Sequence, residues 1–245
     1  MILLQERTIS EIVDCPYLTG VESRLEFFLA SSLDENELDE LLCKGWRKFG
    51  YFFFRPVCSE CLKCVPIRVR VDMFTHSKNQ KKLIKRNKNI KVKFGPIKYS
   101  DDAYRIYCDH SLNRFSQDSD IETFLFNFYS PSSLAFQSEY YFEDQLIGVG
   151  YLDRSGEALN SVYFSFDTSF SNLSLGAFSI LKEIEYAASL NKKHYYLGYY
   201  IDENKRMRYK NRYFPNEKYD WNKEQWILDM EALSDKEFGK DYIRI

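Results

Sequence analysis

Three cysteines follow one another at a strict three-residue step, at Cys58, Cys61 and Cys64. Prolines on both sides of this segment disfavour a helix, so the thiols are expected on a turn and not along one helix face. Thiolates are ligands of structural zinc, and the same C-x2-C-x2-C step opens a ferredoxin-type iron–sulfur run. The spacing therefore favours a metal or cluster site, which needs a fourth ligand, over structural or free thiols.

A second group of side chains could bind a polyanion. Between residues 78 and 93 the chain has eight cations and no acid, although its net charge is only −2. The rest of the chain therefore carries a balance of −10, and the basic segment forms a local positive patch on an acidic body. The alternative interpretation is a solvated helix face. The cations are Lys78, Lys81, Lys82, Lys85, Arg86, Lys88, Lys91 and Lys93.

Length and composition limit the class of protein. A chain of 245 residues can bury one large core or two smaller ones, and aromatic residues make up 17% of it. The apolar runs are too short to cross a bilayer, and no N-terminal export signal is visible. Six cysteines without such a signal indicate reduced thiols. We therefore expect a cytoplasmic protein that does not bind membranes.

The elements of the first half place these groups. Ser32, followed by Glu35 three residues later, predicts a capped helix that ends near Gly45. Strands are expected over residues 51–55, 67–71 and 90–94. The middle strand alternates apolar and basic residues, so Arg68 and Arg70 should point away from the core. Gly95-Pro96 is the expected boundary between an N-terminal domain (1–95) and a C-terminal domain (96–245).

The second half predicts helices over residues 101–115 and 121–129, then three strands over 135–142, 146–153 and 159–166. A helix over 175–190, a strand over 195–201 and a basic, aromatic tail follow. This order suits an acyltransferase layout of the Gcn5-related N-acetyltransferase kind. Ser174, Leu175 and Gly176 lie where such folds turn into the helix that binds a phosphate-bearing donor, because a helix N-terminus attracts anions. The expected fold class is α+β, with a cysteine-rich α/β domain before the acyltransferase-like domain.

Together these segments resemble the bacterial aspartate/glutamate leucyltransferases, which are aminoacyl-tRNA–protein transferases related to eukaryotic arginyltransferase. The resemblance covers nearly the whole chain. It departs from the family pattern at Thr19, Asn79, Thr168 and Tyr200. The matching segments are Cys15–Leu18, Gly45–Arg47, Arg55-Pro56 with the cysteine turn, Pro66–Val69, Gln80–Asn87, Ser174–Gly176, Tyr196–Ile201, Met207, Tyr209-Lys210 and Phe214-Pro215.

The resemblance implies transfer of leucine from leucyl-tRNA to the N-terminal amine of proteins that begin with Asp or Glu, which marks them for degradation. Arginyl-tRNA is the alternative donor. The reaction would be aminolysis of an ester, so the protein must position two substrates, accept a proton and stabilise an oxyanion. No acyl-CoA or nucleotide cofactor is expected.

The resemblance also implies roles for particular residues. Cys15 becomes the best fourth ligand of a zinc ion or iron–sulfur cluster, although bacterial members could keep the turn without metal. Arg68 or Arg70 would pair with the acidic side chain of the acceptor. The basic helix, with Lys78, Lys81, Lys82, Lys85 and Arg86, would hold the tRNA acceptor stem. The candidate catalytic residues are Asp167, Tyr199, Lys205, Tyr209 and Lys210, and Gly198 joins Ser174, Leu175 and Gly176 as a substrate-binding residue.

Two interpretations from other classes remain open. An acyl-CoA-dependent N-acetyltransferase would use the same helix N-terminus, but it gives no reason for the cysteine turn or the basic helix. A metal-stabilised RNA-binding module would explain those two features, but not the acyltransferase-like second half. For Tyr199 and Tyr209, packing in an aromatic core is an equally good explanation.

Overall fold

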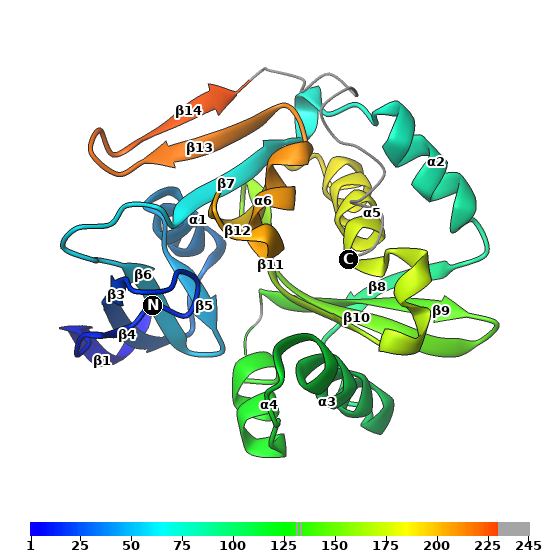
Figure 1. Cartoon of the computed structure of the whole chain (residues 1–245), viewed down its shortest axis with the longest axis horizontal. Coiled ribbons are helices and arrows are strands. Elements are labelled where there is room, and N and C mark those ends of the chain that lie inside the picture. The colour runs from blue at the N-terminus through cyan, green and yellow to red at the C-terminus, as the bar shows by residue number, and fades with distance from the viewer. Residues whose placement is uncertain (131, 133, 230–245) are drawn as a thin grey trace.

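A computed structural model describes residues 1–130, 132 and 134–229 (Figure 1). Residues 230–245 of the expected second domain lie outside this description. The helices are α1 Glu35–Cys43, α2 Lys78–Arg86, α3 Asp101–Phe115, α4 Ile121–Phe128, α5 Leu175–Ser189 and α6 Lys205–Arg208, with 3-10 turns at Val71–Met73, Thr168–Leu173 and Tyr209–Arg212. The strands are β1 Ile2–Ile9, β2 Val13–Asp14, β3 Glu22–Ser23, β4 Leu25–Ser31, β5 Arg47–Phe49, β6 Phe52–Pro56, β7 Val65–Arg70, β8 Lys91–Pro96, β9 Ala135–Phe142, β10 Gln145–Arg154, β11 Ala158–Phe166, β12 His194–Tyr200, β13 Asn216–Asp220 and β14 Gln225–Asp229.

A four-stranded sheet in the order β1-β4-β6-β5 forms the N-terminal part. One of its faces packs Phe28 and Phe53 against Trp46 and the buried leucines of α1. The predicted strand over residues 51–55 is confirmed as β6. The predicted helix cap at Ser32 is wrong. Asp34 caps α1 instead, because its carboxylate accepts from two backbone N–H groups while Glu37 accepts from the backbone N–H of Asp34.

The second sheet has eight strands in the order β14-β13-β7-β12-β11-β10-β9-β8. Its strand β7 comes from the first half of the chain and lies between β13 and β12. Its strand β8, which contains Gly95-Pro96, pairs with β9. The sheet therefore runs across the expected boundary, and the division at residue 95 stays a prediction.

Helices cover both faces of this large sheet. Figure 1 shows α3 and α4 below strands β9 and β10, with α5 and α2 on the opposite side. Buried side chains of α5, among them Leu181 and Ile184, pack with Ile67 and Val69 of β7 in the largest core cluster. The α+β class and the predicted order of strands, crossover helix and strand are confirmed. Within the described residues, no helix is long and apolar enough to span a membrane.

The pairing of β11 with β12 explains where the molecule opens. These parallel strands pair at only three positions, from Ala158 opposite His194 to Asn160 opposite Tyr196. Beyond Tyr196 the pairing of β12 with β7 also shifts register, at Gly198. The strands therefore diverge after Asn160, and a cavity fills the space between them.

Candidate active site

A cavity of about 1340 Å³ lies where β11 and β12 diverge. Residues 161–164 of β11 and 197–199 of β12 form its base, and α2, the start of α5 and the segment from Tyr209 to Pro215 form its sides. Eight Lys and Arg side chains line the cavity, and no Asp or Glu of the described residues does so. The cations are Arg47, Lys48, Lys82, Arg86, Arg114, Arg206, Lys210 and Arg212.

Lys210 is placed deep in this cavity. Its Nζ donates to the backbone carbonyl of Tyr199 at 2.8 Å. Burial lowers the pKa of Lys210 to about 7, and the positive charge of Arg47 adds to this effect. A large share of the side chain is therefore neutral at neutral pH. A neutral amine has a lone pair that can accept a proton from a substrate.

Gly198 separates Lys210 from Arg47. Its φ is +87°, a backbone conformation that favours glycine. A Cβ at this position would lie 3.3 Å from Nη2 of Arg47 and 3.5 Å from Nζ of Lys210. The glycine thus bends β12 and leaves open the space between two cationic groups. The prediction that Gly198 binds substrate is untested, but the residue does lie at the cavity.

Arg47 is a site residue that the sequence reasoning missed. It is 8% exposed, and its guanidinium donates to the side-chain oxygen of Asn160 and to the carbonyl of Ser161. Asn160 in turn donates to Asp153, whose carboxylate pairs with Lys48 at 3.0 Å. The sequence offered only the match of Gly45–Arg47 to the family pattern, which did not show that the Arg47 side chain lies at the cavity.

The start of α5 also reaches the cavity. Ser174 has a left-handed conformation at the N-terminus of α5, and both Ser174 and Gly176 line the wall. Leu175 is fully buried in a core cluster and does not line it. Arg86 donates to the hydroxyl of Ser174 at 3.0 Å, so α2 and the start of α5 meet at one edge of the cavity.

The basic segment forms α2 as predicted. Ser77 and Gln80 make its capping box, and Leu83 and Ile84 anchor it to the core. Two of the cations, Lys82 and Arg86, line the cavity. All five predicted tRNA-binding side chains are exposed: Lys78, Lys81, Lys82, Lys85 and Arg86.

The other candidate catalytic residues lie in different surroundings. The hydroxyl of Tyr199 donates to the carbonyl of Gly45 at 3.0 Å, and burial raises its pKa. Tyr209 lines the cavity, and burial raises its pKa to about 12. Lys205 is exposed and does not line the cavity. Their catalytic roles stay predictions, and the geometry favours Lys210 among them.

Asp167 lies outside the cavity lining. Its carboxylate accepts from the backbone N–H of Ser169 at 3.1 Å and from Arg105 at 3.2 Å. Burial would raise the pKa of Asp167, but these hydrogen bonds hold it below its usual value. This carboxylate therefore has partners within the protein, and its predicted contact with the incoming amine stays a prediction.

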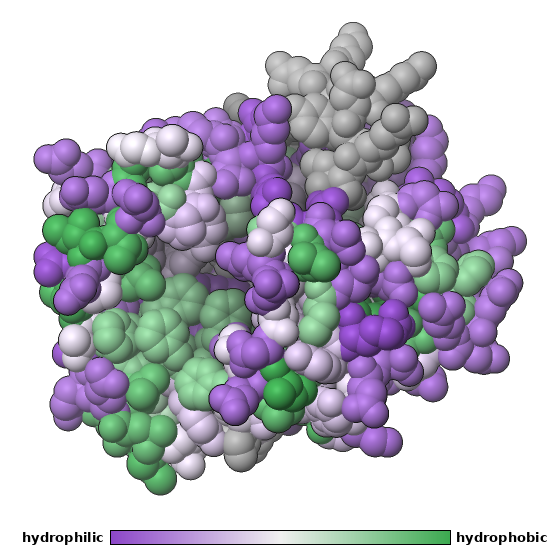
Figure 2. Space-filling view, turned by 60° about the horizontal axis from the view of Figure 1, so that its bottom comes forward, coloured by the Kyte–Doolittle hydropathy of each residue, from purple (hydrophilic) through white to green (hydrophobic). Residues whose placement is uncertain are grey.

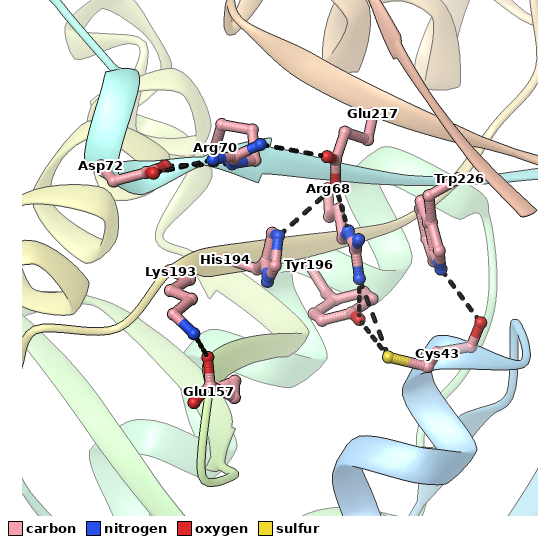
Figure 3. A network of polar contacts seen from close by, with 10 residues as sticks. All are labelled: Cys43, Arg68, Arg70, Asp72, Glu157, Lys193, His194, Tyr196, Glu217 and Trp226. Carbon is pink, nitrogen blue, oxygen red and sulfur yellow. Dashed lines mark hydrogen bonds and ion pairs between the residues drawn. The ribbon is translucent and has the colours of Figure 1, made fainter.

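Arg68 and Arg70 are paired with carboxylates of the protein itself (Figure 3). Arg68 Nε lies 2.5 Å from Glu217, and Arg70 pairs with Asp72 at 2.7 Å and with Glu217 at 3.4 Å. Burial would raise the pKa of Glu217, but His194 and Arg68 hold it at about 2. Neither arginine lines the cavity. Their predicted role at the acceptor carboxylate gains no support from this geometry.

Cys64 lies near enough to Cys15, Cys58 and Cys61 for their charges to act on its thiol. Burial raises the pKa of the Cys64 thiol to about 12, and the other three cysteines add to the rise. Four sulfur donors suit zinc or an iron–sulfur cluster in kind. However, no three His, Cys, Asp or Glu side chains in the described part of the chain are placed to hold one metal ion. The metal site stays a prediction.

Aromatic side chains form the wall nearest the N-terminal sheet. Phe49 and Phe54 line the cavity with ring centroids 6.0 Å apart, and Phe54 lies 6.4 Å from Tyr199. Phe52 and Phe27 continue the row outward at 5.5 and 5.3 Å. Figure 2 shows hydrophobic side chains gathered on this side of the molecule. This wall can contact an apolar side chain of a substrate.

An antiparallel meander, a crossover helix and a parallel strand around a cleft form the layout of an α+β acyltransferase, the class that this fold and cavity define. Two family models match the chain: "Arginine-tRNA-protein transferase, N terminus" over residues 13–82 and "Arginine-tRNA-protein transferase, C terminus" over residues 101–220. The chain belongs to this arginine-tRNA–protein transferase family.

Its relatives include an aspartate/glutamate leucyltransferase of Campylobacter jejuni, which is 32% identical over 91% of this chain and 95% of its own. The aspartate/glutamate leucyltransferase of Helicobacter hepaticus is 31% identical over 85% of this chain and 89% of its own. Among solved structures, FemX is 8% identical with a TM-score of 0.49 and covers 94% of this chain and 87% of its own. L-PGS from Bacillus licheniformis is 12% identical with a TM-score of 0.43, over 71% and 52%.

Proposed function

We propose that this protein transfers leucine from leucyl-tRNA to the α-amine of proteins that begin with Asp or Glu. The charge of the cavity carries this proposal, because eight Lys and Arg side chains and no carboxylate of the described residues line it, although Lys48, which pairs with Asp153, and the partly neutral Lys210 contribute less than a full positive charge. A tRNA and an acidic N-terminus are both anionic, and both match such a lining. The leucyltransferase relatives named above support the same activity.

The reaction joins the acceptor nitrogen to the leucyl carbonyl carbon. The free amine attacks the ester, a C–N bond forms, and the negative charge moves to the carbonyl oxygen. Lys210 takes a proton from the amine nitrogen and gives it to the ribose oxygen as the C–O bond to the ribose breaks, so the ribose leaves as the hydroxyl and Lys210 returns to its neutral form. The ester is already activated, so no covalent intermediate with the enzyme is needed. Cationic side chains of the cavity stabilise the oxyanion.

The lining also favours leucine over arginine as the transferred residue. An arginine side chain brings a positive charge, which a cavity lined by eight cations and no carboxylate of the described residues would repel. A leucine side chain is apolar and can pack against Phe49 and Phe54.

A transfer assay tests the proposal. The purified protein is incubated with leucyl-tRNA, arginyl-tRNA or acetyl-CoA, and with peptides that begin with Asp, Glu, Lys or Arg. We expect leucine on the Asp and Glu peptides only. Transfer of arginine alone, leucine on the Lys and Arg peptides alone, or acetyl transfer alone would each contradict the proposal. Binding of tRNA without any transfer would favour the RNA-binding alternative.

A further inference from the structure

Arg47 is a buried cation without a carboxylate partner in the described part of the chain. Its guanidinium bonds only to neutral oxygens, those of Asn160 and Ser161. The nearby carboxylate of Asp153 acts on Arg47 only through space, because its direct ion pair is with Lys48 at 3.0 Å. By contrast, the buried Arg68 lies against Glu217 at 2.5 Å. The positive charge of Arg47 is therefore open to an anion from the cavity.

A buried charge without a counter-ion costs free energy, which a ligand that brings the opposite charge recovers on binding. Burial lowers the pKa of Arg47, which shows the same cost in the protonation equilibrium. The planar guanidinium matches a carboxylate, to which it can donate two parallel hydrogen bonds. The ligand that suits Arg47 is thus a carboxylate or a phosphate, and the distance to Lys210 favours the carboxylate of an acceptor.

The position of Lys210 tells which carboxylate this is. Arg47 Nη2 and Lys210 Nζ lie 3.3 and 3.5 Å from the point that a Cβ of Gly198 would occupy. The two groups therefore border a common space. In an N-terminal Asp or Glu, only a few bonds of about 1.5 Å separate the α-amine from the side-chain carboxylate. Such a residue can present its amine to Lys210 and its carboxylate to Arg47 at the same time.

We propose that Arg47 binds the side-chain carboxylate of the acceptor's first residue and thereby sets the preference for Asp and Glu. This inference rests on the proposed function, because it names the group that recognises the acceptor. It replaces Arg68 and Arg70, whose charges are compensated by Glu217 and Asp72. Gly198 has a structural part in the arrangement, because any side chain there would fill the space between Arg47 and Lys210.

Peptide binding without tRNA tests the inference independently of transfer. Calorimetry gives the Kd of the parent protein for two peptides that differ only in beginning with Asp or Asn. A hydrogen bond to a charged group predicts a preference of about ten- to a hundredfold for Asp. In Arg47→Gln, which keeps an N–H for Ser161, and in Arg47→Met, the ratio should fall to near one. Arg154→Met, at an exposed arginine outside the cavity, should keep the parent ratio.

Three results would overturn the inference. The parent could bind both peptides equally, or both Arg47 variants could keep the preference for Asp. The Arg47 variants could also bind peptides as the parent does but lose leucyl-tRNA, which would assign Arg47 to the tRNA. Circular dichroism checks that the variants fold. If neither Arg47 variant folds, a crystal structure of the parent with the Asp peptide decides. A peptide carboxylate within hydrogen-bonding distance of Arg47 supports the inference, and a carboxylate bound elsewhere overturns it.

The same experiment separates this inference from the proposed function. If the parent transfers no leucine but binds the Asp peptide in preference to the Asn peptide, the proposed function is contradicted. Arg47 would still be the group that binds the acidic side chain. Arg47→Gln could instead still transfer leucine to Asp peptides with an unchanged Asp-to-Asn ratio of kcat/KM. That result would contradict the role of Arg47 and leave the proposed function intact.

Discussion

Charge reversal on α2 should weaken the binding of leucyl-tRNA and reduce its dependence on salt. The helix is anchored by Leu83 and Ile84, so its exposed lysines can be changed without loss of core contacts. The test variant is Lys81→Glu, Lys82→Glu and Lys85→Glu combined. Lys82 lines the cavity, whereas Lys81 and Lys85 are exposed beside it and do not line it.

The expected size follows from the release of counterions. Each phosphate contact adds about 0.7 to 0.9 to the slope of log K against log salt concentration. Three lost contacts should therefore flatten that slope by about two to three units and raise the KM for leucyl-tRNA. The Kd of the acceptor peptide should stay the same, because the peptide binds at Arg47 and Lys210.

The assay is a series of binding measurements with leucyl-tRNA over a range of salt concentrations. A matched control reverses three exposed lysines outside the cavity lining, Lys44, Lys98 and Lys223, and thus makes the same change in net charge. If the control flattens the slope equally, only total charge matters. If the folded α2 variant keeps the slope and affinity of the parent, α2 is a solvated face.

Three further predictions concern single groups. Below pH 7, log kcat/KM for the acceptor peptide should rise with pH with a slope near two, since Lys210 and the acceptor amine must both lose a proton. In Lys210→Met the slope should be near one. A slope of one in the parent would contradict a role for Lys210 as base. Glu217 should add to the free energy of unfolding at pH values above its unfolded pKa of about 4.3, and this contribution should be lost as the pH falls towards its folded pKa of about 2. Glu217→Gln should remove this acid-sensitive contribution to stability in denaturant titrations. An unchanged pH profile of stability would show that the network of Figure 3 does not stabilise the fold. Anaerobic purification should yield about one equivalent of zinc or an iron–sulfur chromophore, diminished by Cys58→Ser; metal well below one equivalent would leave the cysteines as structural thiols.

The sequence predicted the second half of the fold closely, because its signals are local. The helix at residues 101–115 and the strand at 135–142 have the predicted bounds, since caps and turns mark their ends. The hairpin β13–β14 was missed. Its residues have the composition of a basic, aromatic tail, and the pairing of β13 with β14 and with β7 makes them strands.

Residues of the site were harder to predict than the elements that carry them. Lys210 and Gly198 were found because they lie in segments that match the family. Arg47 was missed, because its burial depends on β5 lying against the first residues of β11, more than a hundred residues away. The charges of Arg68 and Arg70 were predicted to be available, but Glu217 of β13 compensates them. Alternation along one strand cannot show a partner from a distant strand.

The most direct test of the account is the single-turnover rate of leucyl transfer in Lys210→Met, with leucyl-tRNA and an Asp peptide both saturating. Lys192→Met is the matched control, because the Lys192 amine is also largely buried, where it donates to the carbonyls of Ser155 and Gly156, but it does not line the cavity. Loss of a general base predicts a rate about 10²- to 10⁴-fold below that of the parent for Lys210→Met, and a rate near that of the parent for the control. A folded Lys210→Met variant that transfers leucine at the parent rate would contradict the assignment of Lys210 as the general base of the reaction.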